Sequence, residues 1–416
     1  MSTTTQPPAL SSILSAQDFE KAASQSLTPK TWAFYSSAAT DTITHESNRT
    51  MYDRILLRPR ILRNVTSVSM ETNILGCRMD LPLFMSPAAM ATLVHPDGEL
   101  ALARGCARYG IGMCVSTNAA YHLSEITSAA AKQTKNNNIP FFFQLYVNKD
   151  REASKRLLRT AEQNGAKAIF VTVDAPVAGK READERVPLD PNDIRFRTPL
   201  PMSGACIGGN DEKGGGLGRS MGQYIDAGFT WEDLAWLKEN TFLPIVLKGV
   251  QTAEDALLAM EYGVNGIVVS NHGGRSLDTS TSSIAVLMEI RRSCPQVFDR
   301  LEVFVDGGIR RGTDIIKAIC LGAKAVGMAR HFLYSLCYGQ EGVERLIESM
   351  FSVLDSDKVG MLTIAVMRDE LETTMKLLGI TNLSQAHPGL LNTLDVDHLI
   401  TKQSASLHGE PARARL

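Results

Sequence analysis

Short apolar runs alternate with amphipathic segments through most of the chain. Most of the runs show no alternation of apolar and polar positions, which indicates parallel strands buried on both faces. The pattern therefore predicts a parallel sheet whose strands are joined by helices. Eight such runs, rich in β-branched or aromatic residues, lie at residues 83–88, 111–116, 140–146, 168–174, 243–248, 266–270, 301–306 and 325–329.

The segments between these runs carry the signals of helix ends. Thr252 and Asp255 have the spacing of a capping box, and Gly263 follows the helix that this box would start. Asp150 and Gly165 bracket another such segment. Eight strand–helix units are the number in a (β/α)8 TIM barrel, so we expect this α/β fold. A doubly wound open sheet is the alternative, although that fold does not require eight units.

The pattern divides the chain into three parts. We expect an N-terminal arm and helical extension at residues 1–75, the barrel at residues 76–385 and a C-terminal tail at residues 386–416. Within the barrel, residues 187–229 form a long glycine-rich loop after the fourth strand. Barrel enzymes carry lids at such positions, so we expect this loop to cover an active site.

Composition excludes several classes of protein. The 43 basic and 45 acidic residues among 416 leave a net charge of −2, which provides no strong field to hold nucleic acid or an anionic membrane. Apolar residues make up 44%, but no apolar run is long enough to span a bilayer. The seven cysteines include no C-x-x-C pair and several lie in apolar segments, so we expect buried free thiols.

Polar side chains gather at the carboxyl ends of the predicted strands, where barrel enzymes carry their active sites. After the seventh strand comes Asp306-Gly307-Gly308 with Arg310, and Arg330 follows the eighth. Glycines let backbone N–H groups approach a phosphate, and the loops after these two strands are the usual phosphate site of a barrel. The sequence therefore predicts phosphate binding there, and a tight turn with surface arginines is the alternative.

A second group of strand ends could carry proton chemistry. His272 lies between polar and glycine residues after the sixth strand, and Asp174 ends the fourth strand and could orient the imidazole. Arg275 offers a guanidinium fork that matches a carboxylate. Lys248 follows an apolar run, where it needs an anion or an electron-rich ring nearby. No metal motif occurs, and the other histidines, such as His45, are expected to be ordinary surface or core residues.

Together these residues resemble the FMN-dependent 2-hydroxy acid oxidase and dehydrogenase family, which includes glycolate oxidase and the flavin domain of the flavocytochrome L-lactate dehydrogenase. The resemblance covers about residues 27–379, and no haem-binding domain precedes it, so the chain resembles the flavin module alone. The motifs that carry it are LLRPRIL (56–62), FFQLYV (142–147), FVTVDAP (170–176), LKGVQTAED (247–255), SNHGGRSLD (270–278) and VFVDGGIRRGTD (303–314).

The resemblance implies a role for each residue of the predicted site. His272 would be the base with Asp174 behind it, Lys248 would lie beside the flavin N1 edge, and Ser270 would lie near the flavin tail. The residues that would line the isoalloxazine ring are Pro87, Ala88, Ala89, Ser116, Gln144 and Thr172. Those that would hold ribityl and phosphate are Asp306, Gly307, Gly308, Arg310, Ala329 and Arg330. Those that would meet the substrate are Phe34, Asn118, Tyr146, Arg181 and Arg275.

Three positions depart from the family pattern. Phe34 stands where a substrate-binding tyrosine is expected, which removes one hydroxyl contact. Ala329 replaces the glycine that usually precedes Arg330 and adds a methyl group near the phosphate. Asn118 is polar at a position that varies with the substrate side chain. The departures leave FMN binding intact and put the identity of the substrate in doubt.

The resemblance implies oxidation of an (S)-2-hydroxy acid, lactate-like or glycolate-like, to the 2-oxo acid. The flavin would be reoxidised by oxygen, giving hydrogen peroxide, or by another electron acceptor, and the protein would be a homotetramer. Two alternatives are other flavin chemistry on a larger, secondary-metabolite-like substrate and a non-catalytic flavin-binding module. The last three residues, Ala414-Arg415-Leu416, resemble a peroxisomal address of the S-K-L type, which predicts a peroxisomal rather than a cytoplasmic protein.

Overall fold

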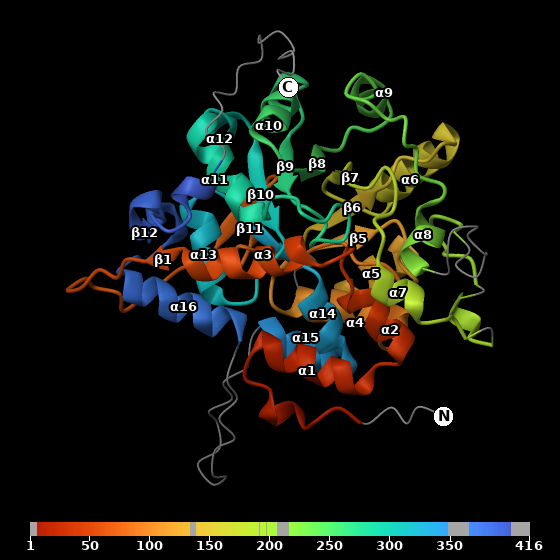
Figure 1. Cartoon of the computed structure of the whole chain (residues 1–416), viewed down its shortest axis with the longest axis horizontal. Helices are drawn as coiled ribbons and strands as arrows, with labels where there is room; N and C mark the ends of the chain where they lie inside the picture. The colour runs from red at the N-terminus through yellow and green to blue at the C-terminus, as the bar shows by residue number, and fades with distance from the viewer. Residues whose placement is uncertain are drawn as a thin grey trace.

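The computed structural model describes residues 6–133, 139–190, 192–196, 198–205, 216–347 and 366–400. At its centre eight parallel strands close a barrel in the order β10-β11-β4-β5-β6-β7-β8-β9 (Figure 1). This closed sheet confirms the predicted TIM barrel and excludes the open sheet. The barrel strands are β4 (Leu83–Met85), β5 (Gly112–Ser116), β6 (Phe141–Leu145), β7 (Ile169–Thr172), β8 (Ile245–Val250), β9 (Gly266–Val269), β10 (Glu302–Asp306) and β11 (Ala325–Met328).

Helices surround the barrel and begin largely where the sequence signals them. Thr252 accepts a hydrogen bond from the Asp255 N–H, and Asp150 accepts one from the Glu152 N–H, so both predicted caps form. The helices after the strands are α4 (Gly98–Arg108), α5 (Leu123–Ala131), α6 (Arg151–Gln163), α7 (Glu182–Arg186), α8 (Leu217–Gly222), α9 (Leu234–Glu239), α10 (Ala253–Glu261), α11 (Ser283–Ser293), α12 (Val297–Arg300), α13 (Gly312–Cys320), α14 (Arg330–Ser335), α15 (Gly339–Ile347) and α16 (Met367–Leu378).

The barrel interior is filled by aromatic rings. Phe84, Phe142, Phe170 and Phe304 point inward from four strands, with ring centroids 5.0 to 6.3 Å apart. A hairpin of β2 (Thr72–Ile74) and β3 (Cys77–Met79) packs its buried apolar side chains onto the same cluster. The core is therefore a packed solid rather than a channel, and the site can form only at an end of the barrel.

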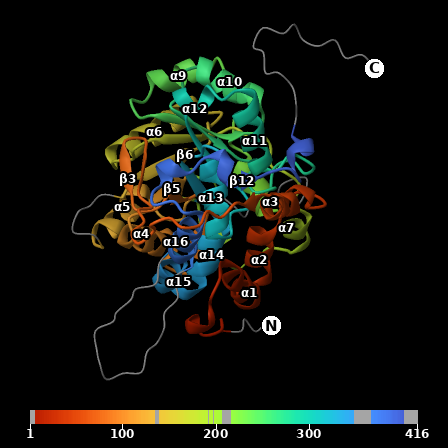
Figure 2. The same cartoon turned by 90° about the vertical axis from the view of Figure 1, so that its left-hand side faces the viewer.

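The N-terminal extension forms three helices that pack on the outside of the barrel. These are α1 (Ala16–Ser26), α2 (Pro29–Ser36) and α3 (Ile43–Arg54), which contact α14, α7 and α11 respectively. Figure 2 shows them on the side of the molecule away from α4, α5 and α6. β1 (Leu56–Leu57) then pairs antiparallel with β12 (Leu391–Asn392). The described part of the C-terminal segment thus packs on the rest of the chain, with Val396 and Ile400 in the core. The division of the chain at residues 75 and 385 stays a prediction.

Two further features bear on the sequence predictions. No helix in the described ranges is long and apolar enough to cross a membrane. The cysteines of the described ranges are free thiols, and Cys106, Cys114, Cys294 and Cys320 are buried. Cys206 and the predicted C-terminal address lie outside the described residues, as does part of the glycine-rich loop.

Candidate functional site

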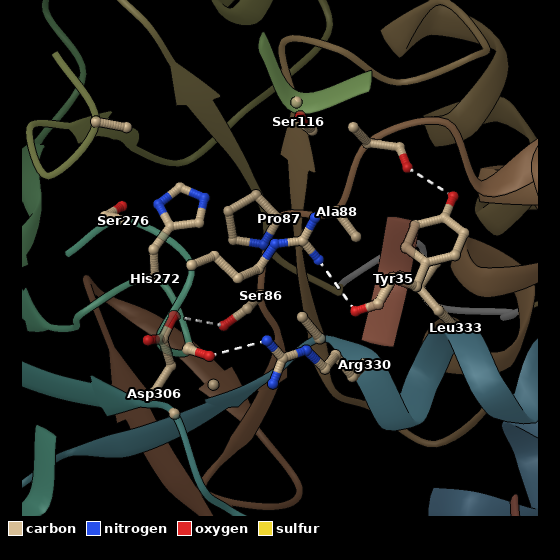
Figure 3. A pocket seen from close by; sticks show the side chains of 18 of the residues that line it. Tyr35, Ser86, Pro87, Ala88, Ser116, His272, Ser276, Asp306, Arg330 and Leu333 are labelled. Carbon is tan, nitrogen blue, oxygen red and sulfur yellow. Dashed lines mark hydrogen bonds between the residues drawn. The ribbon is translucent and has the colours of Figure 1, made fainter. Parts of the chain in front are cut away.

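The carboxyl ends of the barrel strands surround a cavity of about 320 Å³. Figure 3 shows His272, Asp306 and Arg330 around this hollow, with Pro87 and Ala88 from the loop after β4. Asp174 and Ser270 lie behind the cavity wall. Asp174 contacts His272, and Ser270 contacts Lys248. The other residues of the predicted site all line the cavity: Phe34, Pro87, Ala88, Ala89, Ser116, Asn118, Gln144, Tyr146, Thr172, Arg181, Lys248, His272, Arg275, Asp306, Gly307, Gly308, Arg310, Ala329 and Arg330.

Two hydrogen bonds position His272, one through its ring and one through its backbone. Its Nδ1 lies 2.8 Å from Asp174 Oδ1, and its backbone N–H donates to Ser270 Oγ at 3.1 Å. The residue has φ +58, a left-handed conformation that a side chain rarely adopts and that is common at functional sites. A Cβ on Gly249 would lie 2.5 Å from Asp174 Cβ, so a glycine is needed for the carboxylate to pack there. The carboxylate can only accept, so Nδ1 carries the hydrogen and Nε2 keeps its lone pair.

The electrostatics suit a histidine that takes up a proton. Burial lowers the pKa of His272, and the charge of Asp174 opposes this lowering. Burial alone would raise the pKa of Asp174, but the neighbouring His272 and Lys248 outweigh burial and lower it. The imidazole is therefore neutral near pH 7 and faces an ionised carboxylate that would stabilise its protonated form.

Two guanidinium groups face the cavity near His272. Arg275 donates to the carbonyl oxygens of Tyr35 at 3.1 Å and Phe34 at 2.9 Å, and it lies 5.2 Å from the centre of the Phe34 ring. Arg181 caps α7 and reaches the cavity over Gly218, where a Cβ would lie 2.2 Å from a guanidinium nitrogen. Burial lowers the pKa of both arginines, and repulsion from Arg181 adds to the effect on Arg275. Two such half-buried cations favour an anion between them.

Two polar side chains of the cavity lining, Asn118 and Tyr146, lie against Tyr224. Burial raises the pKa of Tyr146 to about 12, so its hydroxyl remains a hydrogen-bond donor. Tyr224, in the loop after β7, donates to Asn118 Oδ1 at 3.1 Å, and its ring meets Tyr146 edge to face at 6.5 Å. The amide oxygen of Asn118 thus already has a partner inside the protein.

Lys248 and Asp306 form an ion pair on the floor of the cavity. Lys248 Nζ lies 3.4 Å from Asp306 Oδ2 and 3.0 Å from Ser270 Oγ. Burial would lower the pKa of Lys248, but the carboxylates of Asp306 and Asp174 outweigh burial and raise it. Ser86 also donates to Asp306 Oδ2, whereas the buried Asp306 Oδ1 has no partner among the described residues. The floor therefore offers a fixed positive charge and a free carboxylate oxygen.

Glycines and arginines shape the end of the cavity beside β10 and β11. Gly307 and Gly308 have φ near +89 and +90, and a Cβ on Gly308 would lie 2.1 Å from the Asn48 carbonyl oxygen. Arg310 pairs with Glu20 of α1 at 3.2 Å, while its buried Nε has no partner in the described part of the chain. Arg330 donates to the Gly273 carbonyl oxygen at 2.8 Å.

Sequence reasoning missed several residues of this cavity. His45 accepts a hydrogen bond from Arg330 at 2.7 Å, so its prediction as an ordinary residue is wrong. His331 and Glu20 also line the cavity, and Tyr224 contacts Asn118. His45 and Glu20 come from the N-terminal helices, whose placement depends on long-range packing that no local pattern signals. A group of His, Cys, Asp and Glu side chains able to hold a metal ion is absent from the described ranges.

The model of one protein family, the FMN-dependent dehydrogenases, matches residues 23–393. The chain belongs to this family. An L-lactate dehydrogenase (cytochrome) of Saccharomyces cerevisiae is 42% identical over 391 residues, which cover 92% of this chain and 61% of the yeast protein. The chain therefore spans less than two thirds of that relative. The glycolate oxidase of Spinacia oleracea is 39% identical over 377 residues, covering 90% of this chain and 94% of the spinach protein.

Solved structures of family members share the fold. The flavin-binding domain of baker's yeast flavocytochrome b2 superposes with a TM-score of 0.79 at 39% identity, covering 98% of this chain and 91% of that chain. A mandelate oxidase with (S)-4-hydroxymandelic acid gives a TM-score of 0.77 at 33% identity, covering 91% of this chain and 98% of that chain.

The cavity residues fit the FMN after which the family is named. The unpaired Asp306 Oδ1 and Arg310 Nε are buried polar atoms that a ribityl hydroxyl and a phosphate could satisfy. Gly307 and Gly308 leave the backbone open to close approach. The chemistry of the donor set thus agrees with a phosphorylated flavin.

Proposed function

We propose that this protein uses FMN to oxidise an (S)-2-hydroxy acid to the corresponding 2-oxo acid. The observation that carries the proposal is the pair of His272 and Asp174, 2.8 Å apart, in a cavity that Arg181 and Arg275 also line. A base next to two guanidiniums suits a substrate that has a hydroxyl group on the carbon beside its carboxylate.

Each of these side chains has a place in the reaction. Arg181 and Arg275 would hold the substrate carboxylate, and Tyr146 would donate a hydrogen bond to the substrate. His272 Nε2 would take up a proton from the substrate, and Asp174 would stabilise the imidazolium that forms. FMN, when bound, supplies a two-electron acceptor. The protein supplies the base and orients the substrate.

The rest of the cavity would hold the flavin. Lys248 would lie beside the ring, where its positive charge favours the negative charge that reduction brings. The ring would rest on Pro87, Ala88, Ala89, Ser116, Gln144 and Thr172, with Ser270 near the tail. Asp306 and Gly307 would meet the ribityl chain, and Gly308, Arg310, Ala329 and Arg330 the phosphate.

A short acid of the lactate or glycolate type is the substrate that the cavity favours. The yeast relative acts on L-lactate and the plant relatives on glycolate, as their names state. Asn118 Oδ1 is held by the Tyr224 hydroxyl, so this oxygen is not free to select a larger polar acid. Phe34 lines the cavity but has no hydroxyl, so it cannot donate a hydrogen bond to the substrate carboxylate.

Oxygen is the electron acceptor that we favour, with hydrogen peroxide as the product. The C-terminal Ala414-Arg415-Leu416, of peroxisomal type, supports this choice. A cytochrome is the alternative acceptor, because the yeast relative is named for one. We further propose a homotetramer, as the family resemblance implies.

Anaerobic mixing with a panel of 2-hydroxy acids tests the proposal. The yellow flavin colour should bleach with L-lactate or glycolate and not with the opposite enantiomer, D-lactate. (S)-mandelate serves as the larger acid, and its selective bleaching would move the substrate to that class. A flavin that no 2-hydroxy acid bleaches would refute the proposed reaction and favour a non-catalytic flavin-binding role or another flavin chemistry.

A further inference from the structure

His331 lies on the cavity wall with an imidazole nitrogen that none of the described residues pairs. It follows Arg330 in α14, and its ring meets Tyr334 edge to face at 5.9 Å. Its Nε2 is buried and has no hydrogen-bond partner among the described residues, although the side chain lines the cavity. A buried polar atom of this kind indicates a ligand that completes its hydrogen bonding.

The groups around His331 are mainly positive. Arg310 reaches this end from the loop after β10, Arg330 from α14 and His45 from α3. Because Arg330 can only donate, the Nδ1 atom of His45 must be unprotonated to accept its hydrogen bond. Burial, followed by Arg310 and Arg330, lowers the pKa of His331 to about 3. Burial and Arg330 lower the pKa of His45 to about 4, so both imidazoles are neutral near pH 7.

The net positive charge of the side chains around His331 is too small to balance a phosphate dianion. Glu20 of α1 forms an ion pair with Arg310 and offsets its charge. Glu46 pairs with Arg49 in the same wall of the cavity. With neutral imidazoles, Arg310, Arg330 and Glu20 leave a net charge of about +1, whereas a phosphate monoester carries about −1.5 to −2 near pH 7. One additional proton on the protein would balance the dianion.

We propose that His331 is a further ligand of the FMN phosphate and that it takes up one proton from solvent when the phosphate binds. The proton is added to the imidazole and shared in a hydrogen bond with a phosphate oxygen, and no covalent bond forms. The inference rests on the cofactor site of the proposed function, but it does not depend on the substrate or on the base.

The direction of the pH effect follows from linkage. The pKa of His331 is low without phosphate and must be higher beside it. Between these two values binding consumes a proton, so FMN affinity should fall as pH rises, by up to about tenfold per pH unit. Above the pKa of the complex, affinity should become independent of pH. FMN affinity should be measured above about pH 6.5, because the phosphate itself is mostly dianionic there.

Release of FMN from the purified flavoprotein on dilution, followed by flavin fluorescence between pH 6.5 and 8.5, tests the affinity. A hydrogen bond to a charged group contributes about 1.5–3 kcal/mol, so His331→Gln should weaken FMN binding about 10- to 150-fold at the low end of this range. The variant should also show a shallower pH dependence than the wild type. His398→Gln, a change of an exposed histidine outside the cavity, should behave like the wild type.

Riboflavin and calorimetry make the test specific. Riboflavin lacks the phosphate, so its binding to stripped protein should be equal in wild type and His331→Gln. Titration of FMN in two buffers of different ionisation enthalpy should show greater proton uptake in the wild type than in the variant. His331→Lys, which would carry its positive charge before FMN binds, should bind FMN tightly with little proton uptake.

Equal FMN affinity and equal proton uptake in the wild type and His331→Gln would overturn the proposal. Equal losses for riboflavin and FMN would also overturn it, because they would indicate a structural role. Neither result bears on the oxidation of hydroxy acids, which flavin bleaching measures separately.

Discussion

Replacing Asp174 by asparagine isolates the effect of one buried charge on the proposed base. The side chain of Asp174 is 0% exposed, and its Oδ1 lies 2.8 Å from His272 Nδ1. Asparagine has the same shape and can still accept from the Nδ1 hydrogen, but it cannot stabilise a positive imidazolium by charge. A larger residue would collide with the backbone at Gly249, which already packs closely against Asp174. The exchange should therefore preserve the geometry and remove only the charge.

The size and direction of the effect follow from this geometry. A hydrogen bond to a charged group contributes about 1.5–3 kcal/mol, so Asp174→Asn should lower kcat/KM about 10- to 150-fold on its pH plateau. Asp174 raises the pKa of His272 against the effect of burial. Its removal should lower that pKa further. Because the base acts in its neutral form, the acid limb of the pH profile should move to lower pH.

Anaerobic stopped-flow measurement of flavin bleaching, repeated across pH with L-lactate or glycolate, supplies the assay. Absorbance of the bound flavin checks that FMN content is unchanged. Asp53→Asn, which alters an exposed carboxylate on α3, serves as the control. An unchanged plateau, or an acid limb that moves to higher pH, would refute the role of Asp174 as the partner that stabilises the protonated base.

Three further outcomes are expected. His272→Ala should keep its FMN but bleach about 10²- to 10⁴-fold more slowly, and bleaching at the wild-type rate would remove His272 as the base. Phe34→Tyr should raise kcat/KM on glycolate or L-lactate about 10- to 150-fold by restoring a hydroxyl beside the carboxylate site. If that change gives no gain while Asn118→Leu harms a larger acid more than the short ones, the larger acid is the substrate. Denaturation should release FMN, and chromatographic detection of FAD instead would contradict a site built for one phosphate.

The sequence predicted the barrel well because its strands are buried on both faces. The run at residues 168–174 contains β7, Ile169–Thr172, and the run at 243–248 overlaps β8, Ile245–Val250. Each run is apolar and uninterrupted, so its position is visible without knowledge of its neighbours. Since the carboxyl ends of parallel strands share one end of a barrel, residues that follow separate strands, such as His272 and Arg330, could be expected to meet.

The remaining parts of the site depend on packing across long stretches of chain. Nothing in the local sequence of α3 indicates that His45 accepts a hydrogen bond from Arg330. Nor does any local pattern show that the carbonyl oxygens of Phe34 and Tyr35 hold Arg275. The sequence did not predict the hairpin of β2 and β3, which packs on the aromatic cluster, because its strands are too short to give a periodic signal.

Closure of the barrel sets the order in which the protein can mature. Leu83 of β4 pairs with Val326 of β11, so the ring of strands joins residues roughly 240 positions apart. At a synthesis rate of about 5–20 residues per second, β11 is synthesised roughly 10 to 50 s after β4. During that time the unpaired edge of β4 can form hydrogen bonds with a wrong strand, so we expect chaperones to bind the nascent chain. A pocket that includes Arg330 cannot be complete before this step, so the prosthetic group would be acquired after translation has passed the last strand.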